Sequence, residues 1–119
     1  EAGLECFGHW LDVLMIRDKF GPDLRTIDPG ALSTGQRKRL GLALALAEDR
    51  QILILDEWAA DQDPDTRRRF YRELLPTLRE AGKTILAATH DEQYFDCCDR
   101  RIHMATGRLN LEVQDDANT

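Results

Sequence analysis

Hydrophobic residues in the first part of the chain follow a helical spacing and then lose it. Within residues 6–19, one face of a predicted amphipathic helix is formed by Trp10, Leu11, Leu14 and Met15. Glycine and proline then become frequent, so residues 20–32 are predicted to form a loop. The N-terminal region is therefore expected to contain one short helix followed by irregular chain.

A second helix is predicted from Ser33 or Thr34 to Glu48. Leucine alternates with the smaller residues glycine and alanine in residues 40–47, a pattern that a strand could also show. Because Leu and Ala are strong helix formers and nothing in the stretch is β-branched, a helix is favoured. Since the stretch is apolar nearly all round, we expect this helix to be buried.

Two aliphatic stretches, residues 52–55 and 84–89, predict strands that are covered on both faces, as in a parallel sheet. Their order, with a helix between them, predicts an α/β fold with a parallel core. In such sheets the chemistry lies beyond the carboxyl ends of the strands. Asp56, Glu57 and His90 all fall at these ends.

The helix between the two strands has start and stop signals. Asp63 is a predicted N-cap and Pro64 a predicted first helical residue. The helix is expected to reach Ala81 and to end at Gly82. Pro76 is expected to kink it.

The C-terminal part of the sequence is predicted to form a short helix and a hairpin. Residues 91–98 are predicted to be helical, and residues 101–105 and 108–113 to pair around a turn at residues 106–107. The polar tail, residues 114–119, is expected to fray.

Composition limits the classes of function. The chain has 119 residues, 42% hydrophobic and 32% charged, which suits a soluble globular domain or a piece of one. No apolar run approaches the length of a membrane helix. The net charge of -6 disfavours nucleic acid as a partner, and the basic runs at residues 37–39 and 67–69 are interpreted as solvated helix faces. Because the chain starts at Glu1, inside a helical region, we interpret it as a fragment without a signal peptide.

The cysteines do not suggest a disulfide framework. Their number is odd, and Cys97 and Cys98 are adjacent, which is a poor arrangement for an ordinary disulfide. We interpret these two and Cys6 as reduced structural residues. A redox pair at the adjacent cysteines is the alternative.

Three segments carry groups suited to nucleotide chemistry. Asp56 and Glu57 end a buried strand, where one carboxylate could serve Mg²⁺ and the other could orient a water; a cap after a core strand is the alternative. Residues 32–36 place Ser and Gly at a helix start, which is an anion site or a simple N-cap. His90 follows the next strand and could contact a γ-phosphate, or could be a surface histidine.

In combination these segments resemble the ATP-binding cassette (ABC) ATPase family. Residues 32–36, Leu-Ser-Thr-Gly-Gln, match the family signature Leu-Ser-Gly-Gly-Gln, with Thr34 in place of one glycine. Residues 52–56 resemble its Walker B strand, Glu57 its catalytic glutamate and His90 its switch histidine.

The resemblance extends over residues 10–111 and has informative departures. Residues 60–63 fall at the D-loop of the family, with Asp63 matching its Asp, and Trp58 stands where the family usually has Pro. Three segments are similar to the cassettes of cyclic-peptide and siderophore-peptide exporters, of the syringomycin and pyoverdine type. These segments are residues 56–64, 70–76 and 90–95.

The resemblance implies a partial P-loop NTPase (RecA-like) parallel sheet. Residues 1–34 would be part of the ABC helical subdomain, up to the signature, and residues 35–119 the C-terminal part of the ATPase core. ATP and Mg²⁺ are the implied cofactors, with Asp56 serving the metal and Glu57 and His90 acting in catalysis. The resemblance also implies a second ATPase domain, paired head to tail with this one. The ATP held by that second domain would be contacted by residues of this chain, namely Ser33, Thr34, Gly35, Gln36 and Asp63.

The same resemblance implies a transmembrane domain as partner, a peptide or siderophore cargo, and a place at the cytoplasmic face of the inner membrane. A soluble non-transport ABC ATPase and a non-enzymatic remnant are the alternatives. Residues 82–84, Gly-Lys-Thr, resemble the last residues of a phosphate loop. However, a phosphate loop follows a strand, whereas a helix is predicted before these residues, and Thr77 stands at the position where the motif requires a glycine. We therefore interpret Lys83 as a solvated end, and expect the isolated chain to be inactive because it lacks a phosphate loop.

Overall fold

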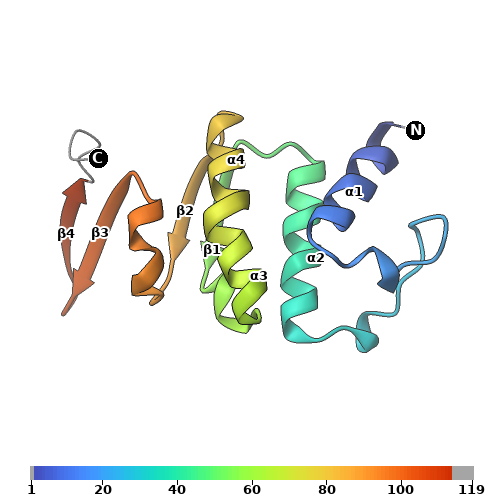
Figure 1. Ribbon diagram of the computed structural model, residues 1–119, viewed down its shortest axis with the longest axis horizontal. Helices are drawn as coiled ribbons and strands as arrows, with labels where there is room; N and C mark the ends of the chain where they lie inside the picture. Colours follow the sequence, from blue (N-terminus) through green and yellow to red (C-terminus); the bar gives the residue numbers. More distant parts are fainter. Residues whose placement is uncertain (1, 114–119) are drawn as a thin grey trace.

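The computed structural model of the chain describes residues 2–113. In Figure 1 the elements form a row, with the N-terminal helices at one end and the C-terminal hairpin at the other. Along the chain these elements are α1 (Ala2–Val13), η1 (Arg17–Lys19), η2 (Pro29–Ala31), α2 (Thr34–Ala47), β1 (Ile52–Asp56), η3 (Trp58–Asp61), α3 (Pro64–Arg69), η4 (Phe70–Leu74), α4 (Leu75–Glu80), β2 (Thr84–Ala88), η5 (Glu92–Cys97), β3 (Arg100–Ala105) and β4 (Arg108–Val113).

Strands β1 and β2 are parallel neighbours, as the sequence predicts. Their register runs from Ile52 opposite Thr84 to Asp56 opposite Ala88. The crossover connection consists of η3, α3, η4 and α4. Because the strands are parallel and in register, both carboxyl ends lie at the same edge of the sheet (Figure 1).

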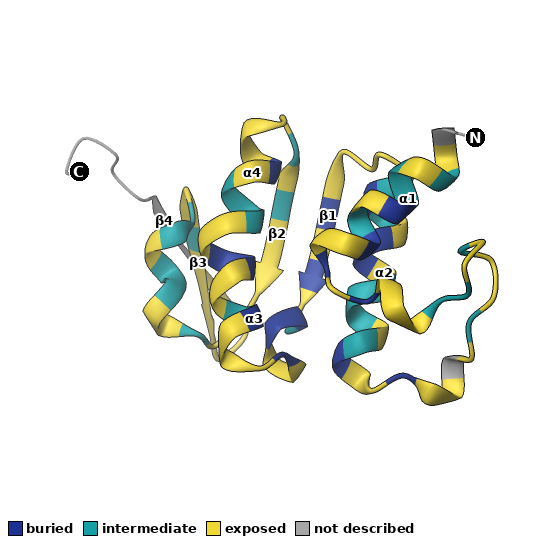
Figure 2. Ribbon diagram, turned by 45° about the vertical axis from the view of Figure 1, so that its right-hand side comes forward, coloured by how far each residue is buried: buried dark blue, intermediate teal, exposed yellow. Residues whose placement is uncertain are grey.

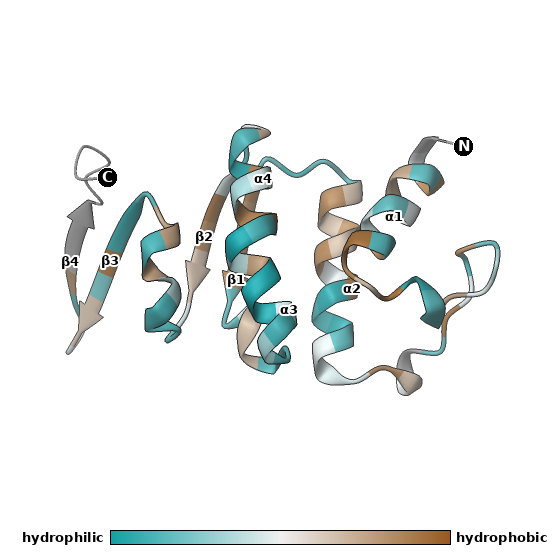
Figure 3. Ribbon diagram, in the orientation of Figure 1, coloured by the Kyte–Doolittle hydropathy of each residue, from teal (hydrophilic) through white to brown (hydrophobic). Residues whose placement is uncertain are grey.

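The expected burial of both faces of the strands is wrong. Along β1, Leu53 and Leu55 are buried whereas Ile52 and Ile54 are 67% and 73% exposed. Strand β2 has no buried residue, as its yellow and teal colours in Figure 2 show. Figure 3 shows that β2 is nevertheless largely hydrophobic. The physical reason is that, among the described residues, the other elements pack on only one face of β1, so the pattern alternates with a period of two.

The core joins the N-terminal helices to β1 and to the crossover. The most deeply buried large side chains are Leu11, Ile16 and Leu78. Helix α2 contributes Leu42, Ala43 and Leu46, but Leu44 is 46% exposed. The expectation that α2 is buried all round is therefore wrong, because α1 and β1 cover only part of its circumference (Figure 2).

The first helix ends earlier than predicted. Helix α1 stops at Val13, and Met15 has a positive φ of 59°, which reverses the chain before the short turn η1. A left-handed residue cannot continue an α-helix. The predicted start of α2 is confirmed, with Ser33 as its N-cap.

The crossover helix contains a π-helical segment. This segment, η4, directly precedes α4, in which Pro76 occupies the first turn. Proline clashes with the carbonyl four residues before it, and the wider π-helical turn moves that carbonyl away. An irregular helical turn thus directly precedes Pro76, the residue at which the sequence predicts a kink. Gly82 follows the helix with a φ of 89°, as a helix stop requires.

The C-terminal predictions are confirmed in part. Strands β3 and β4 pair in antiparallel fashion, and Thr106 and Gly107 have φ values of 49° and 75°, as a tight hairpin turn requires. The helix expected over residues 91–98 is a 3₁₀ helix, η5. The tail predicted to fray, residues 114–119, lies outside the described residues.

Lys83 is not the solvated end that the sequence suggests. Its side chain is only 7% exposed, and its Nζ lies 2.8 Å from both the Asp49 carboxylate and the Arg50 carbonyl oxygen. The cysteines Cys6, Cys97 and Cys98 are free thiols, as predicted. Within residues 2–113, no helix combines the length and the apolar character that a bilayer crossing demands.

Candidate functional site

The carboxyl edge of the parallel sheet brings Glu57 and His90 together. Glu57 follows β1, His90 lies just beyond β2, and His90 Nε2 is 2.9 Å from Glu57 Oε1. An imidazole nitrogen that carries a proton can donate it to a carboxylate at this distance. The predicted proximity of these two groups is therefore confirmed, and both side chains remain open to solvent, with exposures of 91% for His90 and 41% for Glu57.

Glu57 has an unusual backbone conformation. Its φ of 54° and ψ of 34° lie in the left-handed region, which costs free energy in a residue other than glycine. Two contacts hold it: its N–H donates to the Ala88 carbonyl at 2.9 Å, and its carbonyl accepts from Lys38 Nζ at 2.8 Å. The strand register and one lysine thus fix the direction in which the Glu57 side chain points.

Asp56 is the last residue of β1 and is exposed at the same edge. A carboxylate oxygen is a hard ligand of the kind that Mg²⁺ prefers, and Mg²⁺ commonly takes one or two carboxylates together with waters and substrate phosphates. A single exposed carboxylate beside the Glu57–His90 pair fits such a nucleotide-bound metal. No group of three or more His, Cys, Asp or Glu side chains that could hold a metal is found in the described part of the chain.

The segment at the start of α2 forms a capping box. Ser33 Oγ accepts from the Gln36 N–H at 3.1 Å, and Gln36 Oε1 accepts from the Ser33 N–H at 2.9 Å. The simple N-cap is therefore realised, and the Ser33 hydroxyl still has its own proton to donate. In Figure 1 this helix start lies at the same edge as the carboxyl ends of β1 and β2.

Gly35 packs against the turn that follows Glu57. A Cβ placed on Gly35 would lie 2.6 Å from the backbone oxygen of Asp61, so only glycine fits without displacing this turn. Gln62 Nε2 also donates to the Gly35 carbonyl at 3.0 Å, and Gln62 is buried. The start of α2 and the turn η3 are consequently one packed unit.

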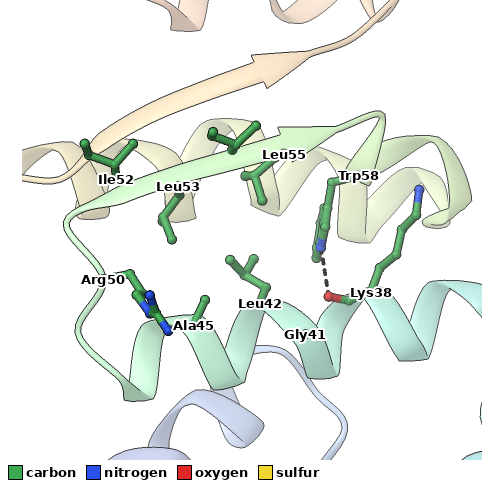
Figure 4. A pocket seen from close by; sticks show the side chains of 10 residues that line it. Lys38, Gly41, Leu42, Ala45, Arg50, Ile52, Leu53, Leu55 and Trp58 are labelled. Atoms are coloured by element: carbon green, nitrogen blue, oxygen red, sulfur yellow. Dashed lines mark hydrogen bonds between the residues drawn. The ribbon is translucent and has the colours of Figure 1, made fainter.

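Lys38 and Trp58 tie the same two elements together. Lys38 Nζ lies 2.5 Å from Asp61 Oδ2, and the Trp58 indole N–H donates to the Lys38 carbonyl at 2.9 Å (Figure 4). Trp58 is buried and stacks on Phe70 with ring centroids 4.5 Å apart. The tryptophan that departs from the usual family pattern therefore has a packing role between α2, η3 and η4.

Asp63 caps α3, as predicted. One carboxylate oxygen accepts from the Thr66 N–H at 2.8 Å, and the Thr66 hydroxyl lies 3.1 Å from the other oxygen. The backbone hydrogen bond from Thr66 lowers the pKa of the Asp63 carboxyl. A carboxylate held in its charged form still has lone pairs for a further donor.

The interpretation of the basic runs as solvated faces is wrong for several of their members. Arg67 is 25% exposed and Lys38 28%, and both donate to backbone carbonyls. Arg39 donates to the Leu14 carbonyl at 3.2 Å. Arg68 and Arg69 do extend along the outer face of their helix, at 50% and 49% exposure. Sequence runs alone do not distinguish these cases, because consecutive residues of a helix point in different directions and only the packing decides which of them face inward.

Sequence reasoning also missed a hydrogen-bonded cluster beside His90. The buried Tyr71 hydroxyl lies 2.8 Å from Thr89 Oγ1 and 3.0 Å from Asp91 Oδ2. Burial raises the pKa of Tyr71 to about 12. A helical tyrosine in the crossover, followed by Thr and Asp on both sides of the histidine, is a signal that could have been used.

Comparisons with known proteins show which family this chain is similar to. The family profile described as ABC transporter matches residues 10–60. The chain is 58% identical over 84 residues to the ATP-binding protein SyrD of Pseudomonas syringae pv. syringae, an alignment that covers 71% of this chain and 15% of SyrD. It is 37% identical over 84 residues to the energy-coupling factor transporter ATP-binding protein EcfA1 of Thermotoga maritima, covering 71% of this chain and 32% of that protein.

Solved structures show the same fold. The CbiO1 protein of Clostridium perfringens, described as part of the ABC transporter complex CbiONQ, has a TM-score of 0.68 at 31% identity, covering 92% of this chain and 42% of that one. The dimeric structure of the bacterial ABC transporter cassette MJ0796 has a TM-score of 0.68 at 25% identity, covering 96% and 47%. Across these relatives and structures, this chain spans between 15% and 47% of their length.

The parallel strands with their acidic and histidine-bearing edge define an α/β unit of the P-loop NTPase class. The profile, the relatives and the matching folds go further: the chain belongs to the ABC ATPase family and carries part of an ABC transporter ATP-binding domain.

Proposed function

We propose that this chain supplies the hydrolytic edge of an ABC transporter nucleotide-binding domain, and that the complete protein hydrolyses ATP to drive export. The observation that carries the proposal is the 2.9 Å contact between His90 and Glu57 beside the exposed carboxylate of Asp56. A water-orienting base, a hydrogen-bond donor for phosphate and a metal carboxylate are the groups that phosphoryl transfer requires.

In this proposal each group has one task. Glu57 orients and polarises the attacking water, and the His90 imidazole keeps the Glu57 carboxylate in position through Nε2 while the ring faces the γ-phosphate. Asp56 holds Mg²⁺ through its carboxylate or a bound water. The metal, when bound with ATP, neutralises charge that develops on the phosphates.

The signature segment and Asp63 act in a head-to-tail pair of cassettes. Ser33, Thr34, Gly35 and Gln36 contact ATP held by the second domain through the Ser33 hydroxyl and the positive end of α2. The dimeric state of the MJ0796 cassette supports a second ATPase domain as partner. Residues 1–34 then belong to the helical subdomain, and residues 35–119 to the ATPase core.

A transmembrane domain is the second proposed partner, and the domain works at the cytoplasmic face of the inner membrane. The similarity to CbiO1, which is part of an ABC transporter complex, supports such a partner. The cargo is a cyclic or siderophore-like peptide, a proposal supported by the subgroup resemblance at residues 56–64 and by the 58% identity with SyrD.

The test is Glu57→Gln in the complete protein. The amide cannot accept the proton of the attacking water, so hydrolysis should fall by on the order of 10²–10⁴-fold while ATP stays bound. Glu80→Gln is the matched control, because Glu80 is exposed near the end of α4, away from the site. An unchanged hydrolysis rate in the Glu57 variant would remove the proposed catalytic role.

The isolated 119-residue chain is proposed to be inactive, since its sequence contains no phosphate loop to hold ATP. Purified chain should show no Mg-ATP turnover above a blank that lacks the protein. Sustained turnover that disappears in the Glu57→Gln chain would contradict this part of the proposal.

A further inference from the structure

Arg67 contacts two loops that belong to different strands of the sheet. It lies in α3, and its side chain is 25% exposed. Arg67 Nε donates to the Ala59 carbonyl at 3.2 Å, and Arg67 Nη2 donates to the Gln62 carbonyl at 3.1 Å. Both carbonyls belong to the segment that follows Glu57. The third nitrogen, Nη1, lies 3.9 Å from Asp91 Oδ1 and thereby reaches the residue next to His90.

Asp91 is held from its other side as well. Its Oδ2 lies 3.0 Å from the Tyr71 hydroxyl and 3.2 Å from the Thr89 hydroxyl, and its N–H donates to Thr89 Oγ1 at 3.0 Å. The backbone on both sides of His90 is therefore fixed by a cluster whose cationic member is Arg67. The other residue of this cluster in the crossover, Tyr71, is buried.

We propose that Arg67 is a positioning residue that keeps the segment after Glu57 and the segment around His90 in register. The proposal rests on the proposed ATP hydrolysis, because the register matters through the Glu57–His90 contact. Arginine is suited to this task, since its planar fork offers five donors in a fixed geometry and can donate to two carbonyls while its charge faces a carboxylate. A lysine has one compact charge and cannot span the same three groups.

The same contacts give Arg67 a second connection. Gln62, whose carbonyl accepts from Arg67, donates from its side chain to the Gly35 carbonyl at the start of α2. Packing at the signature segment is thus connected, through one residue and one guanidinium, to the loop that carries His90.

The kinetic test compares Arg67→Ala and Arg67→Lys in the complete transporter. A misplaced Glu57–His90 pair should lower kcat for ATP hydrolysis by roughly 10- to 100-fold, while KM for ATP changes by less than about twofold. The lysine variant should recover only part of the loss. The matched control is Arg68→Ala, because the ion-pair partners of Arg68 among residues 2–113 are Asp65 and Glu73, on the outer face of the helix, and Arg68 is 50% exposed.

The proposal would be overturned by an unchanged kcat in Arg67→Ala, by a loss equal to that of Arg68→Ala, or by a lysine variant as active as the wild type. A loss confined to KM would do the same, because it would mean that Arg67 affects nucleotide binding instead.

A second measurement separates this inference from the proposed function. Hydrogen exchange of the complete protein should become faster in both residues 58–62 and residues 89–92 when Arg67 is replaced by alanine. Faster exchange in residues 58–62 alone would overturn the register role, whatever the protein hydrolyses. If the wild type and its Glu57→Gln variant hydrolyse ATP equally, the proposed function fails, and the exchange experiment still decides the role of Arg67.

Discussion

His90 Nε2 lies 2.9 Å from Glu57 Oε1, so the residues that follow two neighbouring parallel strands bring an imidazole and a carboxylate into contact at the carboxyl edge of the sheet. Both side chains are substantially exposed, and a contact between exposed groups contributes little to folding stability. What the fold provides is position: the strand register fixes the two backbones, and Lys38 holds the Glu57 carbonyl. The pair is therefore expected to matter for chemistry far more than for stability.

Replacing His90 tests this separation. His90→Ala removes the donor that faces Glu57, so hydrolysis by the complete protein should fall by roughly 10²–10⁴-fold. The unfolding free energy of the chain should change by less than about 0.5 kcal/mol, because the side chain is exposed. ATPase assays and urea titration measure the two effects. His103→Ala, an exposed histidine on β3, is the control and should leave both unchanged. A large stability loss with intact hydrolysis would reverse the argument.

Gly35 and Gly41 offer a matched pair of glycine substitutions in one helix. A methyl group at Gly35 would meet the Asp61 carbonyl oxygen at 2.6 Å, whereas one at Gly41 would meet nothing within 4 Å. Gly35→Ala should therefore destabilise the chain by about 1–3 kcal/mol, as overpacking does. Gly41→Ala should stabilise it by about 0.5–1 kcal/mol through helix propensity.

Chemical denaturation of both variants, with the wild type alongside, measures the difference. Equal effects at the two positions would mean that the turn η3 moves freely and that Gly35 does not fix its distance from α2.

The site was more predictable from the sequence than the burial of the sheet. The aliphatic run ending at Asp56 predicts a strand and its carboxyl end, and a parallel neighbour then brings His90 to the same edge. The same run also predicted that both faces of the strand are buried, and that prediction is wrong. Ile52 and Ile54 look like core residues, yet they are exposed among the described residues, because burial depends on what packs against a strand and not on its own composition.

The contacts of charged side chains were the least predictable part. Arg67 and Arg68 are neighbours of the same type, but the helix directs one toward the Ala59 carbonyl and the other toward Asp65 on its own surface. The Lys83 side chain is only 7% exposed and pairs with Asp49, although Lys83 follows a helix stop. Such differences arise from tertiary packing, which a run of sequence letters does not contain.

Trp58 allows its packing and its hydrogen bond to be measured separately. Trp58→Phe keeps an aromatic ring against Phe70 but loses the donor to the Lys38 carbonyl, so it should cost about 0.5–1.5 kcal/mol of unfolding free energy. Trp58→Ala also removes a buried ring and should cost about 3–5 kcal/mol. Urea titration of the chain gives both values. If the phenylalanine variant were as unstable as the alanine variant, the hydrogen bond and not the packing would hold η3 to α2.

Tyr71 makes the folding stability of the chain depend on pH in the alkaline range. Burial raises the pKa of Tyr71 to about 12, whereas an unfolded tyrosine has a pKa of about 10. The folded state therefore favours the neutral phenol. This contribution is fully present below about pH 10, and it is lost as the pH rises through the folded value of about 12. Tyr71→Phe should remove this alkaline decline, and the difference in phenolate absorbance between wild type and variant should have its midpoint near pH 12. A midpoint near that of an unfolded tyrosine would mean that the Tyr71 hydroxyl is solvated and does not form the buried cluster with Thr89 and Asp91.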